Sequence, residues 1–345
     1  MPARRLATLR TPRTQRPAAQ RGIALITAIV LVAIATVLAT SIGFAAVMAA
    51  RRASATFGAD QALLAAEGAE DMAGYVLKQS GATSGSGDWP GQVWAQPYGP
   101  YPLAPDVTLQ FAQIDDEQGK FNLNDLAAGG KTDGEAVQEF QRLLQLVGLE
   151  PKWASLMADW IDGDNMPNDP DGAEDSVYLG QTPPYRPPNM PVTSISELMA
   201  LPGFGRDRFN RIAPYISALP PPTKINLCTA AGVVLDALSG KDEYGTASST
   251  LSELRTQGDC HPSITEFNTS LSQQQISTLA PRIGTTSSYF RLRTFITIAV
   301  PGSACTVCCT SKTADRFAPS SELSVPNKPW QIGSFCVCRM GRPSV

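Results

Sequence analysis

The chain has 345 residues, of which 43% are apolar and 17% are charged, and its formal net charge is −3. Residues 1–22 hold six of the 28 basic residues and no acidic residue, and residues 305–345 hold five basic and two of the 31 acidic residues. The part between them therefore has 17 basic and 29 acidic residues, which makes it a poor polyelectrolyte partner for nucleic acid. The length allows one or two folded domains.

The first long apolar segment begins directly after a glycine. Residues 23–50 carry no charge, and a helix of that length, at a rise of about 1.5 Å per residue, crosses a hydrocarbon core of about 30 Å. A secretory signal has a shorter apolar region followed by its cleavage site, whereas Gly22 precedes the apolar segment here. Residues 51–79 contain no proline and predict that the helix continues as an amphipathic stalk to about residue 80.

An ordinary single-pass anchor has a similar apolar segment, but the glycine at the junction is more specific. A basic leader that ends in glycine, an aliphatic segment and a continuing amphipathic helix resemble the N-terminus of type IV prepilin-like proteins. The resemblance implies that a membrane prepilin peptidase cleaves after Gly22 and methylates the new N-terminal residue, Ile23. Most such proteins carry glutamate at the fifth mature position, where it neutralises a neighbouring subunit's ammonium group in an apolar bundle. This chain has Thr27 there, which suits a subunit at the top of a filament.

Four further segments carry long, ordered motifs: "GKFNLNDLA" (119–127), "ADWIDGDNMPNDPDGAEDSVYL" (158–179), "YRPPNMPVTSISELMALPGFG" (185–205) and "PYISALPPPTKINLCTAAG" (214–232). Together with the N-terminus they resemble the minor pseudopilin K (GspK-like) family of type II secretion systems, in which the missing glutamate is usual. The resemblance implies a single-pass inner-membrane protein whose main domain lies in the periplasm and caps a short filament that supports export of folded proteins. The implied partners are the I-, J- and H-type minor pseudopilins, the major pseudopilin, the prepilin peptidase and inner-membrane lipid, with no nucleic acid.

The part of the chain after the stalk predicts an α+β fold. Residues 107–114 and 290–299 alternate apolar and polar side chains, as half-buried strands do. Residues 135–148 and 152–161 show the three-and-four spacing of amphipathic helices. An S-x-x-E capping box that begins at Ser194 marks the start of another helix.

Two similar stretches, "KFNLN" at 120–124 and "KINLC" at 224–228, flank the helical segments. They predict that the chain leaves and re-enters one sheet there, so that the fold is a long N-terminal transmembrane helix followed by a pilin-like α/β sheet domain with a large all-helical insert. The expected organisation is a basic leader (1–22), a transmembrane and stalk helix (23–80), a first pilin-like part (81–125), a helical insert (126–223), a second pilin-like part (224–304) and a tail (305–345).

The segment after the second predicted helix is strongly acidic, with no basic residue between Lys152 and Arg186. Carboxylates at this density repel one another unless water solvates them or a hard cation such as Ca²⁺ neutralises them. An EF-hand is excluded because, counting from Asp162, Pro167 stands where that loop needs glycine. A solvated acidic loop is the alternative, but the family resemblance implies calcium at the corresponding loop. The candidate ligands are Asp162, Asp164, Asp169, Asp171, Glu174 and Asp175.

The segment "LPGFGRDRFNRI" (201–212) resembles a helix-hairpin-helix turn. The backbone amides of such a turn can hold a phosphate, and Arg206, Arg208 and Arg211 lie close by in sequence. This raises an alternative function, a signal-anchored periplasmic DNA-binding module. The same P-G-x-G sequence also occurs wherever two helices turn tightly, and the acidic body of the chain weighs against DNA.

The residues do not support an enzyme. The only histidine, His261, precedes a proline, so an H-E-x-x-H zinc site and a Ser-His-Asp triad lack support. Cys228 and Cys260 are the only cysteines before residue 305. In the oxidising periplasm that the resemblance implies, they are expected to form a disulfide.

The tail 305–345 contains the other five cysteines and shows neither strand nor helix periodicity. A C-x-x-C-C metal site is one interpretation, although no later ligands follow at a recognisable spacing. The other is that the tail is translated out of frame, since one permitted codon choice, read from the last base of the Ala304 codon, gives a strand, a turn, a second strand and a stop. We expect the natural frame to complete the sheet in this way.

Overall fold

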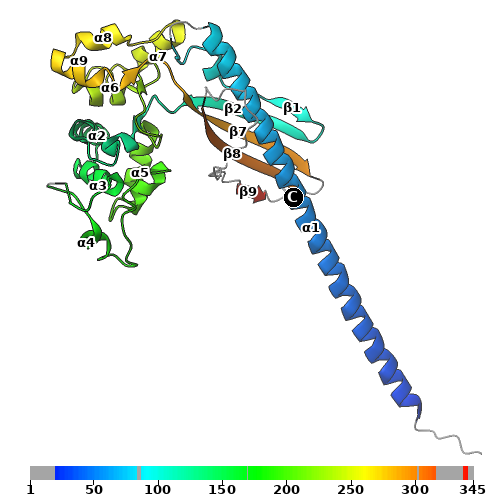
Figure 1. Cartoon of the computed structure of the whole chain (residues 1–345). Helices are drawn as coiled ribbons and strands as arrows, with labels where there is room; N and C mark the ends of the chain where they lie inside the picture. The colour runs from blue at the N-terminus through cyan, green and yellow to red at the C-terminus, as the bar shows by residue number, and fades with distance from the viewer. Residues whose placement is uncertain (1–19, 84–86, 169, 301–302, 316–336, 341–345) are drawn as a thin grey trace, which may run out of the picture. The chain divides into compact units, whose positions relative to one another are not determined.

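The computed structural model describes residues 20–83, 87–168, 170–300, 303–315 and 337–340. The chain divides into two compact units, Met1–Gly58 and Ala59–Val345. Helix α1 (Gln20–Thr83) begins in the first unit and ends in the second. The second unit also contains a five-stranded sheet and a helical body (Figure 1).

Helix α1 confirms the prediction of a long apolar N-terminal helix. Its stretch Ala24–Ser80 includes an 18-residue window with a mean hydropathy of 2.6, none of it buried, so α1 is long and apolar enough to cross a membrane. Threonine hydroxyls in this stretch donate to carbonyls one turn back, as from Thr36 to Val32 O at 3.0 Å and from Thr40 to Thr36 O at 2.9 Å. These bonds satisfy the hydroxyl groups within the helix, as an apolar environment requires.

The sheet is antiparallel with the order β1-β2-β7-β8-β9. Its two predicted strands, β2 and β7, pair directly, with Ile114 opposite Leu292. The buried face of the sheet forms one core with Ala62 and Leu77 of α1. The strands are β1 (Tyr101–Ala104), β2 (Val107–Asp116), β7 (Tyr289–Val300), β8 (Ser303–Asp315) and β9 (Val337–Met340).

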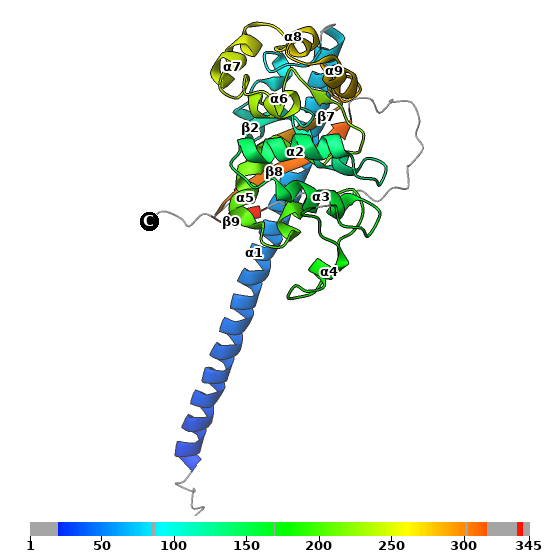
Figure 2. The same ribbon diagram turned by 90° about the vertical axis from the view of Figure 1, so that its left-hand side faces the viewer.

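The helical body has its own apolar core, which extends from Phe121 to Ile283. Within it the rings of Phe121 and Phe140 stack with centroids 5.2 Å apart. Figure 2 shows α2, α3 and α5 together with α6 to α9 in this body. Its elements are β3 (Phe121–Asn122), η2 (Leu123–Ala127), α2 (Gly134–Leu146), α3 (Lys152–Ile161), α4 (Asp175–Tyr178), η3 (Ile195–Ala200), α5 (Gly205–Ile212), η4 (Ala213–Tyr215), β4 (Ile216–Ser217), β5 (Ile225–Asn226), α6 (Gly232–Ser239), α7 (Ser248–Gln257), α8 (Ile264–Thr269), α9 (Gln273–Leu279) and β6 (Ile283–Gly284).

The helical body is larger than the expected insert of 126–223. Residues from Ile225 to Ile283 share the core of α2 and α3, because the short helices α6 to α9 each have an apolar face that they cannot bury alone. One polar contact across this core runs from Arg142 Nε on α2 to the Ala237 carbonyl on α6, at 2.7 Å.

The expectation that "KFNLN" and "KINLC" belong to one sheet was wrong. The first stretch contains β3, which pairs in parallel with β4, and the second contains β5, which pairs in parallel with β6. Both two-stranded sheets lie in the helical body because Phe121 and Ile225 bury their side chains in its core.

Strand β8 covers the beginning of the tail, for which the sequence predicted no strand. It pairs with β7, for example Cys305 opposite Ile298. Pairing through backbone hydrogen bonds does not require alternating side chains, which explains why the periodicity gave no signal. The out-of-frame interpretation stays a prediction, and most of residues 316–345 lie outside the described part of the chain.

Candidate functional site

The loop between α3 and α4 brings three carboxylates together. Asp162, Asp164 and Glu174 each offer an oxygen atom, and these atoms lie within 4.8 Å of one another. Both carboxylate oxygens of Glu174 and Oδ1 of Asp162 are buried and have no hydrogen-bond partner among the described residues. Buried polar atoms normally have partners, and a hard cation such as Ca²⁺ prefers oxygen ligands of this kind. The donor set therefore fits a calcium ion.

Asp159 organises the loop from the last turn of α3. Its side chain is fully buried, and its carboxylate accepts hydrogen bonds from the backbone N–H of Asn168 at 3.2 Å and of Ala173 at 2.6 Å. Gly172 is required here because a Cβ atom would collide with the Asp159 carboxylate and the Asn168 backbone. The loop is therefore folded around an acidic side chain that is not itself in the three-carboxylate group.

Two residues outside the acidic segment hold the candidate ligands in place. Thr132 Oγ1 donates to Asp162 Oδ2 at 2.7 Å, and Asn189 Nδ2 donates to the backbone carbonyl of Asp164 at 2.7 Å. Sequence reasoning missed Thr132 and Asn189, because they lie 30 and 25 positions from the residues they contact.

The electrostatics of the loop favour a bound cation. Burial raises the pKa of Glu174 to about 7, and the charges of Asp159 and Asp162 act in the same direction. Burial also raises the pKa of Asp162, although the hydrogen bond from Thr132 lowers it. Glu174 therefore resists full ionisation at neutral pH unless a positive charge compensates it.

The structure does not bring all six predicted ligands together. Asp171 is exposed and lies outside the three-carboxylate group. Asp175 Oδ2 lies 3.3 Å from Arg186 Nη1, with which it forms an ion pair. Asp169 lies outside the described residues.

The predicted processing site lies at the beginning of α1. Gly22 and Ile23 are in its first turn. The side chain of Thr27 is exposed, and its Oγ1 donates to the Ala24 carbonyl at 3.0 Å. The hydroxyl at the fifth mature position is thus bonded within its own helix.

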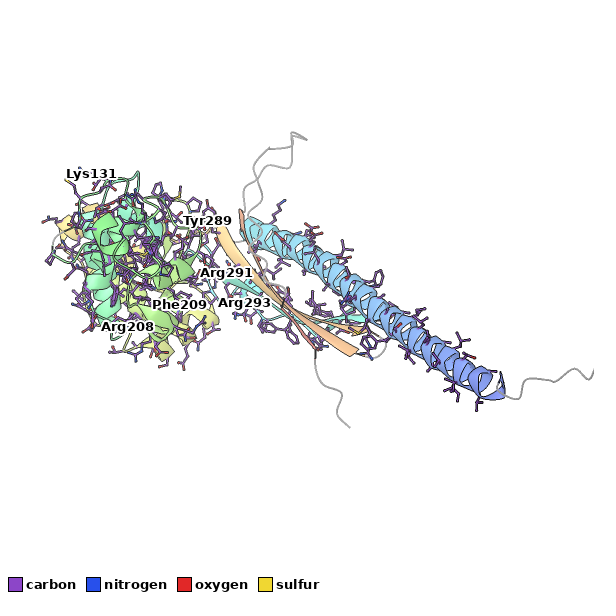
Figure 3. All side chains as sticks on the ribbon, turned by 90° about the horizontal axis from the view of Figure 1, so that it is seen from below. Lys131, Arg208, Phe209, Tyr289, Arg291 and Arg293 are labelled. Atoms are coloured by element: carbon purple, nitrogen blue, oxygen red, sulfur yellow. A yellow bond between two sulfur atoms is a disulfide. The ribbon has the colours of Figure 1, made fainter. Side chains whose placement is uncertain are left out.

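The hairpin segment 201–212 uses its central arginine for its own structure. Arg208 Nη1 donates to the carbonyls of Gly203 at 3.0 Å and Phe204 at 3.1 Å, and its guanidinium lies 5.5 Å from the centroid of the Trp153 ring. Figure 3 shows Arg208 on the helical body. Nη1 of Arg208 is therefore bonded within the turn itself.

Cys228 and Cys260 are joined by a disulfide in the structure, with their Cα atoms 4.6 Å apart. The bond connects the segment after β5 to the loop between α7 and α8. It therefore closes a loop of the helical body that contains α6 and α7.

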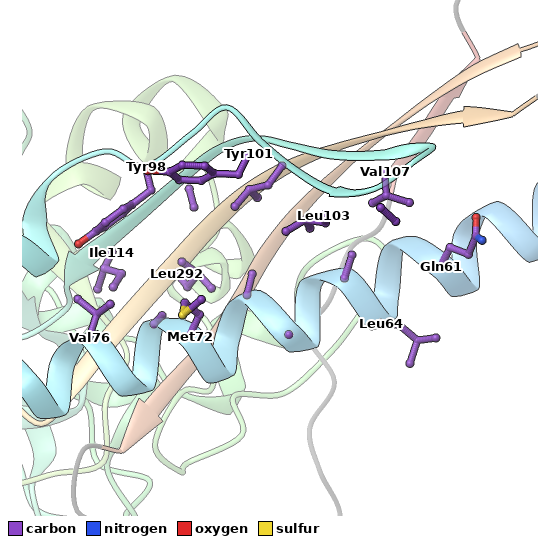
Figure 4. A pocket seen from close by; sticks show the side chains of 17 residues that line it. Gln61, Leu64, Met72, Val76, Tyr98, Tyr101, Leu103, Val107, Ile114 and Leu292 are labelled. Carbon is purple, nitrogen blue, oxygen red and sulfur yellow. The ribbon is translucent and has the colours of Figure 1, made fainter.

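An apolar groove of about 780 Å³ lies between α1 and the strands β1 and β2 (Figure 4). Small side chains on α1, such as Ala69 and Ala73, leave the space open, and Tyr98 and Val107 line the opposite side. Leu64, on the rim of the groove, is 67% exposed. The sequence did not predict this groove, because its two walls come from a helix and a hairpin whose distance the periodicity does not specify.

Comparison with known proteins gives consistent results for several parts of the chain. A family model described as type II secretion system protein K matches residues 119–221, and one described as the PilX N-terminal region matches residues 21–69. The type II secretion system protein K of Pseudomonas aeruginosa is 33% identical over 228 residues, which are 64% of this chain and 68% of the relative. The protein of the same name from Klebsiella pneumoniae is 34% identical over 219 residues, which are 61% of this chain and 66% of the relative.

Among solved structures, the GspK-GspI-GspJ complex of the type 2 secretion system of enterotoxigenic Escherichia coli contains a chain of similar fold. The two chains superimpose with a TM-score of 0.62 at 25% sequence identity, and the match covers 76% of this chain and 94% of the chain in the complex. None of these similarities supports the DNA-binding alternative.

Proposed function

The chain belongs to the type II secretion system protein K family and is a minor pseudopilin of that system; from this premise we propose that it caps the tip of the pseudopilus and supports export of folded proteins across the outer membrane. The observation that carries the proposal is Thr27, whose hydroxyl is bonded to Ala24 within its own helix. Thr27 offers no carboxylate to the N-terminal ammonium group of a further subunit. That ammonium group would therefore remain an unpaired charge in an apolar bundle. Cross-links mapped along the filament test the proposal, because a tip subunit contacts only subunits below and beside it.

The tip position requires anchoring and processing. Helix α1 supports a single-pass anchor in the inner membrane, in contact with its lipid, with the second unit in the periplasm. A prepilin peptidase would cleave after Gly22 and methylate Ile23, so that the mature chain retains α1. The purely basic charge of residues 1–22 supports a cytoplasmic leader.

The groove between α1 and the β1–β2 hairpin is the surface we assign to a sister minor pseudopilin. A related chain assembles with GspI and GspJ in a solved complex, and subunits anchored in one membrane bring their N-terminal helices side by side. Leu64 and Met72 are 67% and 64% exposed at this groove, and burying such side chains favours association. The occupant is an apolar helix face of a sister subunit, and the major pseudopilin adjoins the complex from below.

Calcium is the cofactor that the acidic loop fits. Asp162, Asp164 and Glu174 would hold it, and the ion would supply the positive charge that the buried carboxylates of Asp162 and Glu174 lack. The alternative is a loop neutralised by protonation, which the raised pKa of Glu174 makes physically reasonable. A melting temperature that depends on calcium distinguishes the two.

A further inference from the structure

Arg255 is a buried cation whose partners are backbone carbonyls. Its side chain lies in the last turn of α7 and is 6% exposed. Nε donates to the His261 carbonyl at 2.5 Å, Nη1 to the Ala230 carbonyl at 2.8 Å and Nη2 to the Leu227 carbonyl at 2.7 Å. Burial lowers the pKa of Arg255 to about 10, and no carboxylate in the described part of the chain forms an ion pair with it. Burying a cation without a carboxylate partner is unfavourable. The three hydrogen bonds to carbonyls are therefore what stabilises the charge of Arg255 in this buried position.

The three carbonyls flank the two cysteines of the disulfide. Leu227 directly precedes Cys228, and Ala230 follows it by two positions, while His261 directly follows Cys260. The planar guanidinium, with its fixed fork of donors, therefore holds both chain segments in one orientation. In the same segment, the Cys228 N–H donates to Asn226 Oδ1 at 3.0 Å. No sulfur atom takes part in either set of bonds.

We propose that Arg255 is the positioning residue for formation of the Cys228–Cys260 disulfide: it brings the two thiols together in the folded, reduced chain, and the bond closes afterwards. Cys260 is partly exposed and Cys228 is fully buried, so Cys260 meets the oxidant first. Its thiolate attacks a sulfur of a disulfide oxidant and displaces one thiol. The Cys228 thiolate then attacks Cys260 Sγ and displaces the second thiol. The cysteines lose two electrons and two protons, and the oxidant is reduced to two thiols.

The test measures ring closure in the full-length protein, in detergent, with the five tail cysteines replaced by serine. The reduced protein is exposed to oxidised glutathione, and the species are trapped by alkylation and counted by mass. We expect the wild-type reduced protein to keep its native fluorescence and to close without accumulating the Cys260–glutathione mixed disulfide. In Arg255→Met the second step should slow by about tenfold or more, because the hydrogen bonds to the charged group are lost, and the mixed disulfide should accumulate.

Arg142→Met is the matched control, because it removes another arginine that donates to a backbone carbonyl in the same body, but its acceptor, Ala237 on α6, is not one of the residues that flank the two cysteines. It should lower stability without slowing closure. If Arg255→Met does not fold, Arg255→Lys keeps the charge but loses the fork, and it should show an intermediate closure rate. The proposal is overturned if reduced wild-type protein is unfolded, or if the Arg255 variants close as fast as Arg142→Met.

Discussion

Asn226 Nδ2 donates to Asp116 Oδ2 at 3.0 Å, across 110 positions of sequence. Asp116 is the last residue of β2 and Asn226 ends β5, so the bond joins the sheet to the helical body. The same amide donates to the Asp88 carbonyl at 3.0 Å, and Ser287 Oγ donates to Asp116 Oδ2 at 2.6 Å. A single polar cluster thus connects the segment after α1, the end of β2, strand β5 of the helical body and the segment before β7.

The first prediction concerns this cluster. Asn226→Ala leaves the Asp116 carboxylate and the Asp88 carbonyl without one donor each, which should cost about 1–3 kcal/mol of stability. The measurement is the melting temperature of the full-length protein in detergent. Asn165→Ala, an exposed asparagine of the acidic loop, is the control and should change it little. Equal melting temperatures for the two variants would show that the cluster does not stabilise the connection between the sheet and the helical body.

The companion variant Asp116→Asn adds a pH dependence to this test. Burial raises the pKa of Asp116 in spite of its hydrogen bonds. A carboxyl whose folded pKa is raised contributes stability that is fully present below its unfolded pKa and is lost as pH rises through the folded value. The stability of the wild-type protein should therefore fall as pH rises through the folded pKa of Asp116, and the stability of Asp116→Asn should not show this fall.

The sequence predicted the parts of the fold that have strong local periodicity. The alternation in β2 and β7, the spacing in α2 and α3 and the capping box at Ser194 all have their structural counterparts. It did not predict that α8 and α9 join the core of α2. The structure shows capping boxes at Ser263 and Ser272, but a cap indicates where a helix begins and not which core it joins.

The candidate metal site shows the same limit. The density of acidic residues indicated that this loop is a candidate cation site. Its backbone is irregular, so no periodicity in the sequence separates Glu174, which is 4% exposed, from the exposed Asp171. The selection depends on Asp159, which folds the loop, and on Thr132 from a distant segment. Such contacts follow from tertiary packing and leave no signal in local sequence.

The second prediction concerns calcium. Millimolar calcium should raise the melting temperature of the wild-type protein relative to chelator, and an ion at about 100 times its Kd would add about 2.7 kcal/mol. Glu174→Gln should lose most of this shift. In chelator it should melt at or above the wild-type temperature, because it removes a carboxyl that burial and its neighbours disfavour in the charged form.

Asp171→Asn is the control for calcium, because it removes a carboxylate of the same loop that lies outside the three-carboxylate group. It should keep the full shift. A wild-type melting temperature that neither calcium nor chelator moves would favour the loop neutralised without metal.

The third prediction concerns the groove. Leu64→Asp places a charge at the apolar rim and should weaken capture of the I- and J-type minor pseudopilins by at least tenfold, because burying an unpaired charge is unfavourable. Leu63→Asp makes the same change at a neighbouring exposed position of α1 that does not line the groove. Affinity measured with detergent-solubilised proteins should separate the two variants. Equal losses would place the contact elsewhere on α1.

The fourth prediction concerns processing. Peptidase cleavage should free Ile23 as the mature N-terminus, and Gly22→Leu should block it, because a side chain there hinders an extended backbone in a narrow active site. Gly43→Ala, within α1 and with open space around its added Cβ, should be cleaved normally. N-terminal sequencing of membrane-extracted protein decides the matter, and an intact Met1 leader on the mature wild-type chain would contradict the prediction.

The last prediction concerns the tip position, to which Thr27 and the helical body both contribute. Thr27→Glu alone should still anchor in the membrane and join its sister subunits, because the bulk of the helical body still obstructs a further layer. The structure shows how to remove that bulk: Asp116 at the end of β2 pairs with Phe290 near the start of β7. Residue 117 then lies opposite residue 289, so a two-residue Asn-Gly turn, which favours tight hairpins, can replace residues 118–288 in register.

With the helical body removed and Thr27→Glu added, the chain presents both a carboxylate for the next subunit's ammonium group and free space above the sheet. We expect this double variant to enter the filament shaft, and the hairpin replacement with Thr27 retained to remain excluded. Site-specific cross-linking along isolated filaments measures the outcome. Wild-type chains found at repeated positions along the shaft would overturn the tip assignment. Exclusion of the double variant would show instead that the fifth-position carboxylate and the missing bulk are not sufficient for entry.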